Sequence, residues 1–468
     1  MQVMMDPAGA SSLKALALYT VVVAGAVGTL ALRSELGIYL LTVLLPLQTT
    51  RYHLHGLPLG SNIVDILLIC TLIGTLIRPP NSESKRPAIL TFLALLCGFY
   101  LLSLWRGAFY LGGQMPISFA DPRLVDYKNF IVMPLLAFVA LRAIRTKAQI
   151  AVVIALCCIT AVAVDYSYLK SASGRDFSHY AEETRDAGPL GYAGENGLAS
   201  YMAEITAFIL PILALRKKAG VRLLIVVCVA ANIVCVLFSY SREAYLALAL
   251  TLCFIAVVRV RWLFVPLLCL AIGSQMILPQ AVLERIAMTY TRPNAGEAAA
   301  LDASAQERVL LWTDAINLFQ SNPVIGTGFL TYSRLGRVGS YQDTHNFYLK
   351  MLVETGVVGL ALFLLQLLLL FRQGLRLFVS ATDRFLSLVG LGYAALILAA
   401  AIVNVFGDRW MFIQVDSNLW ILLGCVLSAS SLSSDTPTAP VNHKAEPRLR
   451  HAWHGSPTPT LALEGATQ

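Results

Sequence analysis

The chain has 468 residues, of which 57% are hydrophobic and 13% are charged, and its formal net charge at pH 7 is +8. Soluble domains carry about 25% charged residues, so the composition excludes an ordinary soluble protein and predicts an integral membrane protein. The positive charge does not indicate nucleic-acid binding, because the Lys and Arg residues lie mainly in short loops between apolar runs, where membrane topology explains many of them.

Apolar runs along the chain predict an all-α, polytopic membrane protein with about 12–13 transmembrane helices, because a span needs roughly 20 apolar residues and lipid requires a fully paired backbone. The first run is interpreted as a retained span rather than a signal peptide. The predicted spans are 13–32, 36–49, 61–77, 88–105, 126–145, 148–168, 197–215, 221–239, 243–258, 262–279, 346–371, 385–405 and 417–432.

Lys and Arg clusters in alternate loops predict which loops are cytoplasmic, and the loops between them then face outward. With an odd number of spans the N-terminus is outside. This interpretation divides the chain into a transmembrane region with the first ten spans (1–279), a large outward loop containing helices (280–345), the last three spans (346–432) and a disordered cytoplasmic tail rich in Ser, Thr, Pro and Ala (433–468).

Several chemistries lack their sequence signals. All nine cysteines lie in apolar runs, which argues against a disulfide framework or a zinc site. There is no Walker-type loop, dinucleotide fingerprint, H-E-x-x-H helix or D-x-D-like element in an outward loop. We therefore expect no nucleotide donor, no catalytic metal and no cofactor.

The large outward loop contains a predicted helix. Ser304 and Glu307 have capping-box spacing, and an apolar face follows them. Asn322-Pro323 is expected to end the helix, and Gly326 and Gly328 allow the backbone to turn back sharply. A polar module of this size between long apolar segments is a natural place for chemistry.

His345 is the first candidate for that chemistry. It stands where the polar loop meets the next apolar run, with Asp343 two residues before it, and histidine is the usual general base near neutral pH. The structural alternative is a histidine that only begins a helix. Asn346 is expected to position the loop or a substrate.

Two arginines are the next candidates. Arg242 interrupts two long apolar runs, where a charge needs an aqueous cavity or a partner such as Glu243; it could also snorkel to the interface. Arg308 lies on the loop helix and could be an ordinary solvated charge. Paired guanidinium groups suit a diphosphate.

Further charged residues have weaker signals. Glu204 lies within a span and could pair with a polar group on a neighbouring helix, and Asp408 and Arg409 could pair with each other. An excess of outward arginines mildly favours an anionic substrate on that side; it includes Arg106, Arg175, Arg185, Arg334 and Arg337.

The motifs of the loop resemble the O-antigen ligase and O-antigen polymerase superfamily of bacterial membrane glycosyltransferases. The pattern is R-x3-W, N-P-x-x-G-x-G and H-N-x-Y-L-x-x-L-x-E-x-G-x-x-G, with an upstream S-R-x-A at Ser241 to Ala244. The loop pattern is carried by Arg308, Trp312, Asn322, Pro323, Gly326, Gly328, His345, Asn346, Leu349, Leu352, Glu354, Gly356 and Gly359.

The resemblance implies a metal-independent, inverting transfer of a glycan from an undecaprenyl-diphosphate carrier to an acceptor hydroxyl, at the periplasmic face of the inner membrane. It implies that His345 is catalytic and that Arg242 and Arg308 bind the diphosphate. Supporting roles fall to Asn346, Trp312, Asn322, Gly326, Gly328 and Glu354, of which Glu354 is expected to be a structural hydrogen-bond partner.

The acceptor is left open by the sequence. It could be lipid A-core for a ligase, another glycan for a polymerase in polysaccharide biosynthesis, or a protein serine for an O-oligosaccharyltransferase. An anion transporter is the alternative from another class, because outward arginines and an intramembrane Glu204 could line an anion route. The absence of evident repeated halves and the long helical loop favour an enzyme.

Overall fold

The computed structural model describes residues 13–47, 54–79, 87–190, 192, 194–215, 219–288, 290–291, 300–301, 303–337 and 343–434. These residues form a helical protein, which confirms the all-α prediction. The only strands in the described ranges are β1 (Tyr290–Thr291) and β2 (Ala300–Leu301), which pair antiparallel. Residues 435–468, which make up nearly all of the predicted tail, lie outside the described residues.

The helices follow the apolar runs closely. In chain order they are α1 (Leu13–Ala31), α2 (Glu35–Leu44), η2 (Gly60–Asn62), α4 (Ile63–Ile77), α5 (Ala88–Tyr110), α6 (Pro122–Ala143), α7 (Lys147–Ala172), η3 (Glu182–Thr184), α8 (Gly194–Ile209), η4 (Leu210–Ala214), α9 (Ala219–Phe238), α10 (Arg242–Val258), η5 (Arg261–Leu263), α11 (Phe264–Ile277), α12 (Gln280–Ala287), α13 (Ala303–Ser321), α14 (Tyr332–Leu335), α15 (Phe347–Ser380), α16 (Arg384–Val403), η6 (Arg409–Met411) and α17 (Ile413–Ser434).

Nine helices within the described ranges are long and apolar enough to span a membrane, or ten if a bent helix pair counts as one span. The chain is therefore a polytopic membrane protein, with fewer full-length helices than the 12–13 predicted. The difference arises because some apolar runs form short helices. α2 has 10 residues and α11 has 14, whereas a full span needs roughly 20.

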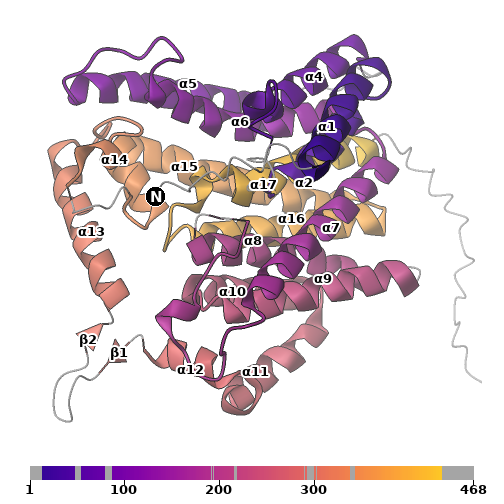
Figure 1. The fold of residues 1–468 in the computed structure, drawn as a ribbon, viewed down its shortest axis with the longest axis vertical. Coiled ribbons are helices and arrows are strands. Elements are labelled where there is room, and N and C mark those ends of the chain that lie inside the picture. Colours follow the sequence, from indigo (N-terminus) through magenta and orange to yellow (C-terminus); the bar gives the residue numbers. More distant parts are fainter. Residues whose placement is uncertain are drawn as a thin grey trace, which may run out of the picture.

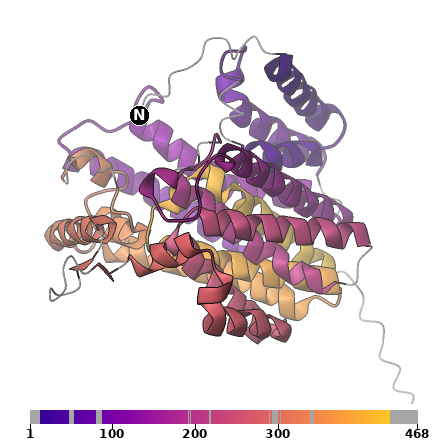
Figure 2. The same ribbon diagram turned by 60° about the horizontal axis from the view of Figure 1, so that its bottom comes forward.

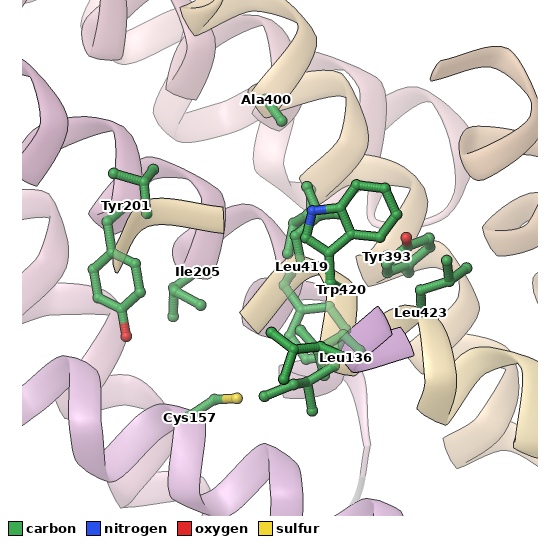
Figure 3. Packing of buried hydrophobic residues seen from close by; sticks show 14 of the residues in the cluster. Leu136, Cys157, Tyr201, Ile205, Tyr393, Ala400, Leu419, Trp420 and Leu423 are labelled. Atoms are coloured by element: carbon green, nitrogen blue, oxygen red, sulfur yellow. The ribbon is translucent and has the colours of Figure 1, made fainter. Parts of the chain in front are cut away.

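The interior of the bundle is formed by α8, α16 and α17, whose residues are mostly buried. α16 packs against α15, α8 and α10, and α17 packs against α6. Side chains from these helices and α7 form one apolar cluster, in which Tyr201, Tyr393 and Trp420 are prominent (Figure 3). α10 and α15 both pack against α16, and both helices carry residues of the candidate site.

The elements of the 280–337 segment lie at one end of the bundle. α12, α13 and α14 gather there, outside the packed helices, in both views (Figures 1 and 2). α13 is two-sided as predicted: Leu311 and Ala315 are buried, whereas Leu310 and Ile316 are exposed. The helix begins at Ala303, so Ser304 lies inside its first turn rather than at the predicted capping position.

Candidate active site

Four arginine side chains from four different segments line one cavity of about 500 Å³. Arg185 follows η3, Arg242 begins α10, Arg285 lies on α12 and Arg308 lies on α13. Glu243, the residue after Arg242, lines the same cavity. Guanidinium groups make forked, charge-assisted hydrogen bonds with phosphate oxygens, so this arrangement suits an anionic ligand with more than one phosphate.

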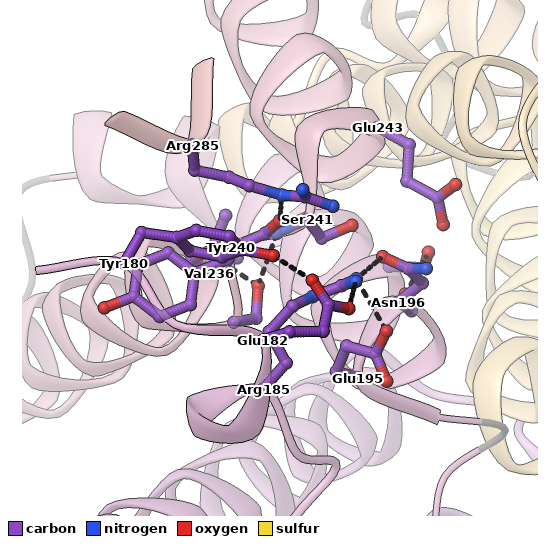
Figure 4. Close-up of polar contacts among 12 residues, drawn as sticks. Tyr180, Glu182, Arg185, Glu195, Asn196, Val236, Tyr240, Ser241, Glu243 and Arg285 are labelled. Atoms are coloured by element: carbon purple, nitrogen blue, oxygen red, sulfur yellow. Dashed lines mark hydrogen bonds and ion pairs between the residues drawn. The ribbon is translucent and has the colours of Figure 1, made fainter. Parts of the chain in front are cut away.

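Arg185 is held in place by two carboxylates (Figure 4). Its Nη1 lies 2.7 Å from Oε1 of Glu182, and its Nη2 lies 2.6 Å from Oε1 of Glu195. The hydroxyl of Tyr180 donates to Glu182. Burial, together with that hydrogen bond, raises the pKa of Tyr180 to about 12, so the phenol remains a donor at neutral pH.

Arg285 reaches the cavity because the chain bends sharply before it. Leu278 is extended and precedes Pro279, and proline disfavours helical backbone at the residue before it. α11 and α12 consequently meet at 101°. The guanidinium of Arg285 then stacks 4.8 Å from the ring of Tyr180, and its Nε–H donates to the carbonyl oxygen of Tyr240 at 3.4 Å.

Glu243 is partnered from a distant part of the chain. Its Oε1 accepts from Nη2 of Arg409 at 3.2 Å, and both side chains are buried. The positive charge of Arg308 also acts on Glu243. The carboxylate next to Arg242 is thus opposed by positive charge, which reduces its repulsion of an anion in the cavity.

His345 lies in the turn that leads into α15. Its backbone has the unusual φ of 48°, and its N–H donates to Oδ1 of Asp343 at 2.8 Å. The ring Nδ1 lies 3.1 Å from the same carboxylate oxygen. Asn346 caps α15, because its side chain accepts from the N–H of Leu349 at 3.1 Å. The turn therefore fixes the imidazole beside a carboxylate.

Trp312 connects His345 to the cavity. It lines the cavity from α13, and its indole N–H donates to the carbonyl oxygen of Thr344. Thr344 in turn donates its hydroxyl proton to the carbonyl oxygen of Asn346. His345 itself is not among the lining residues, so it stands next to the Trp312 wall rather than among the arginines.

The N-P-x-x-G-x-G segment forms hydrogen bonds with backbone groups at a break in α15. At Gly356 the helix has a non-helical backbone, with φ 68° and ψ −170°. The N–H of Val357 donates to the carbonyl oxygen of Pro323 at 2.9 Å, and the N–H of Gly328 donates to that of Glu354 at 2.7 Å. The loop thereby pairs groups that the break leaves open, as an apolar environment requires.

Close backbone packing explains the glycines of this segment. A Cβ on Gly326 would lie 2.3 Å from the carbonyl carbon of Glu354, and one on Gly328 would lie 2.1 Å from Cα of Gly107 on α5. Both glycines have positive φ, 67° and 121°. Arg106 of α5 also donates to the carbonyl oxygen of Gly326 and, at 3.1 Å, to Oδ1 of Asn322.

Glu354 is fully buried beneath the same loop. Its Oε2 accepts from the N–H of Leu330 at 2.9 Å, and its Oε1 accepts from the N–H of Tyr332 at 3.0 Å. Asn322, Gly326, Gly328 and Glu354 thus hold α13 and the start of α15 in a fixed relationship.

Among the weaker sequence candidates, Asp408 and Arg409 have partners other than those expected, and Glu204 has a partner of the expected kind. Asp408 and Arg409 do not form the pair considered from the sequence: Asp408 pairs with Lys350 of α15, and Arg409 pairs with Glu243 of α10. Glu204 is buried beside Asp416 of α17. This matches the structural alternative, in which Glu204 meets a polar group on a neighbouring helix.

Arg285 is the site residue that sequence reasoning missed. It lies in a stretch without a motif, and its route to the cavity depends on the bend at Pro279. Arg185 was noticed only as one of several outward arginines. The available signal for a partly buried cation was the group of five acidic residues within ten positions of it, Asp176, Glu182, Glu183, Asp186 and Glu195.

The described residues contain no group of three or more His, Cys, Asp or Glu side chains arranged to hold a metal ion. The fold and this site define a multi-pass membrane protein with an arginine-lined cavity at one end of its helical bundle.

Residues 224–364 match the family model of the O-antigen ligase domain, Wzy_C. The match supports the O-antigen ligase and polymerase superfamily that the motifs predicted, and it supports an O-antigen ligase-like glycosyltransferase. The matched segment contains Arg242, Arg285, Arg308 and His345. No curated protein matches the chain.

Proposed function

We propose that the protein transfers a glycan from an undecaprenyl-diphosphate carrier to an acceptor hydroxyl, at the periplasmic face of the inner membrane. The observation that carries this proposal is the convergence of four arginines on one cavity whose Trp312 wall is bonded to the residue before His345. A lipid diphosphate supplies both the anionic group that the arginines would bind and a leaving group already attached to the sugar.

In the proposed mechanism, Arg242 and Arg308 bind the diphosphate, with Arg185 and Arg285 completing the cationic wall. Charge grows on the diphosphate as its bond to the sugar breaks, and guanidinium groups fixed in advance stabilise that charge. The arginines are therefore expected to act on the transition state as well as on binding, so their loss should lower kcat and raise KM for the donor.

His345 is proposed to accept the proton of the acceptor hydroxyl. If its Nδ1–H is directed to Asp343, its Nε2 carries the lone pair that takes this proton. The acceptor oxygen forms a bond to the anomeric carbon, while the bond from that carbon to the phosphate oxygen breaks and the diphosphate leaves with the electron pair. One direct displacement inverts the configuration at the anomeric carbon, and no metal takes part in the proposal.

The acceptor class is proposed to be a glycan or lipid A-core hydroxyl, as in polymerases and ligases, with a protein serine as the alternative within the superfamily. Product analysis separates them. A ladder of lengthening glycans identifies a polymerase, whereas glycan attached once to lipid A-core or to protein identifies a ligase or a protein O-oligosaccharyltransferase.

A transfer assay with purified protein tests the proposal. It would contain an undecaprenyl-diphosphate-linked glycan, a mixture of the three acceptor classes and EDTA. We expect wild-type protein to transfer glycan, and Arg242→Ala, Arg308→Ala and His345→Ala each to lose about a hundredfold or more of the rate, the usual cost of removing a charge-stabilising or proton-transferring group.

Arg334→Ala is the matched control. Arg334 lies on α14 at the same end of the bundle, but it forms a partly exposed ion pair with Asp126, and such pairs contribute little. Its rate should equal that of wild type. Full transfer by His345→Ala, at equal expression, would show that His345 is not the proton acceptor. Absence of transfer by wild type with every acceptor, together with movement of small anions in liposomes, would favour the transporter alternative.

A further inference from the structure

The loop between α16 and α17 carries two adjacent charged residues that bind different helices. Oδ2 of Asp408 lies 2.6 Å from Nζ of Lys350 on α15. The next residue, Arg409, places its Nη2 3.2 Å and its Nε 3.3 Å from Oε1 of Glu243 on α10. Two consecutive residues, Asp408 and the first residue of η6, therefore tie together two helices that are far apart in the sequence.

Both ion pairs are almost fully enclosed. The side chains of Lys350 and Asp408 are 7% and 2% exposed, and those of Arg409 and Glu243 are 8% and 3% exposed. Removing charges from water offsets most of the attraction between them, so apolar side chains of similar volume often fold equally well or better. The two pairs are therefore poorly explained by stability alone, and they do fix geometry.

The two tied helices are those that present the proposed site. Glu243 directly follows Arg242, which lines the arginine cavity. Lys350 is the fourth residue of α15, and His345 lies in the non-helical turn just before this helix. α16 packs against both helices, and it lies between α15 and α10 in Figure 1, so the loop at its end reaches both of them.

Uncharged contacts join α15 to the same loop and to the last turn of α16. The N–H of Phe347 donates to the carbonyl oxygen of Asn404 at 2.9 Å and to that of Gly407 at 3.2 Å. The hydroxyl of Tyr348 donates to the carbonyl oxygen of Ala401 at 2.7 Å. On the α10 side the buried connection runs through Arg409, which makes that residue the more specific target for a test.

We propose that Asp408 and Arg409 are positioning residues, which set the distance between the diphosphate-binding end of α10 and the His345 end of α15. The inference rests on the proposed function, because it assigns these residues to the same reaction. A shift of about 1 Å between reacting groups can cost roughly a hundredfold in rate. The two ties should act on different kinetic constants, since one holds the donor side and the other holds the proton acceptor.

Gly407→Ala is a selective way to disturb the α10 tie. A Cβ at this glycine would lie 2.8 Å from Cζ, Nε and Nη2 of Arg409, so the methyl group must displace the guanidinium. No charge is removed, and the displaced atoms are the end of a flexible side chain, so the fold should tolerate the change. Gly174→Ala is the matched control, because a Cβ there meets nothing within 4 Å.

The α15 tie is tested by a double replacement. Lys350→Met with Asp408→Leu removes both charges together and leaves neither one buried alone. Lys350→Arg keeps the charge and serves as the conservative variant. Kinetics would be measured with undecaprenyl-diphosphate-linked glycan as the varied donor, on protein that elutes as a monodisperse peak in detergent.

We expect Gly407→Ala to raise KM for the donor, and the Met/Leu double variant to lower kcat with KM little changed. Lys350→Arg should recover most of the rate, and Gly174→Ala should match wild type. Wild-type kcat and KM in both Gly407→Ala and the double variant, while Arg242→Ala remains inactive, would overturn the positioning role alone. Failure of wild type to transfer would overturn the proposed function, and this inference with it.

Discussion

The indole nitrogen of Trp312 lies 3.1 Å from the carbonyl oxygen of Thr344 and donates a hydrogen bond to it. Trp312 lines the arginine cavity, and Thr344 is the residue before His345. This one bond therefore joins the part of the site that would bind a diphosphate to the part that would accept a proton. It spans 32 residues of sequence, within the segment that matches the O-antigen ligase domain.

Trp312→Phe should lower the transfer rate about fivefold, because the ring is kept while a hydrogen bond worth about 1 kcal/mol is lost. The loss should appear in kcat, since the bond holds the turn that carries His345. Trp262→Phe is the control, because Trp262 is 59% exposed on η5. Equal rates for the two variants would mean that the Trp312 bond does not hold the site together.

Gly326→Ala should destabilise the protein much more than Gly336→Ala. Both glycines have positive φ, 67° and 56°, so each replacement carries the same backbone strain of about 1–2 kcal/mol. Only at Gly326 would the new Cβ meet backbone atoms, 2.3 Å from the carbonyl carbon of Glu354, whereas nothing lies within 4 Å at Gly336. Overpacking of this kind adds about 1–3 kcal/mol.

Thermal unfolding in detergent would measure the difference between the two glycine variants. A lower midpoint for Gly326→Ala than for Gly336→Ala is the expected result. If both variants unfold at the same temperature, the loop can move away from α15, and the close packing between them is not essential to the fold.

Glu354→Gln should also destabilise the protein, by about 1–3 kcal/mol. Its amide nitrogen cannot accept a hydrogen bond, so one of the two backbone N–H groups that bond to the wild-type carboxylate would lose its acceptor. The carboxylate accepts from both Leu330 and Tyr332. Glu183→Gln, at an exposed position in η3, is the control. A variant with the stability of wild type but without transfer would instead give Glu354 a part in the chemistry.

The sequence predicted the helices well and their lengths less well. Apolar runs identify helical segments because backbone N–H and C=O groups in lipid must be hydrogen-bonded within the segment. The structure confirms an all-helical membrane protein. The predicted span 36–49, which forms α2, was already short in the sequence, whereas hydropathy alone did not show that α11 has only 14 residues. Asn346 was recognisable as the start of a helix, because a capping side chain acts within three residues.

Long-range contacts were out of reach of local patterns. Arg285 joins the cavity through a 101° bend, and Glu243 finds Arg409 across 166 residues. Neither relationship leaves a periodic or spaced signal in the sequence. The glycines were recognisable as turn residues, but their role in pairing the broken backbone at Gly356 emerges only when α5, α13 and α15 are seen together.

His179 gives a prediction about pH for the contact between the 173–190 loop and α12. Its Nδ1 lies 2.8 Å from Oε1 of Glu284 on α12, and the hydrogen bond to that carboxylate, with its charge, raises the pKa of His179 above the usual 6.5. Glu284 also accepts from the N–H of Tyr180, next to Arg285. Because the folded pKa is raised, the pair contributes fully below about pH 6.5 and is lost as pH rises through the raised pKa.

Glu284→Gln should therefore lower the pKa of His179 towards 6.5, as followed by NMR of the imidazole ring. Asp176→Asn is the matched comparison, because Asp176 acts on His179 by charge alone and contributes less than Glu284. Its effect should have the same direction and a smaller size. An unchanged titration in Glu284→Gln would mean that α12 does not hold His179 in solution. In wild type, loss of the His179–Glu284 pair as pH rises should weaken the contact between α12 and the 173–190 loop. An unchanged titration would contradict that expectation too.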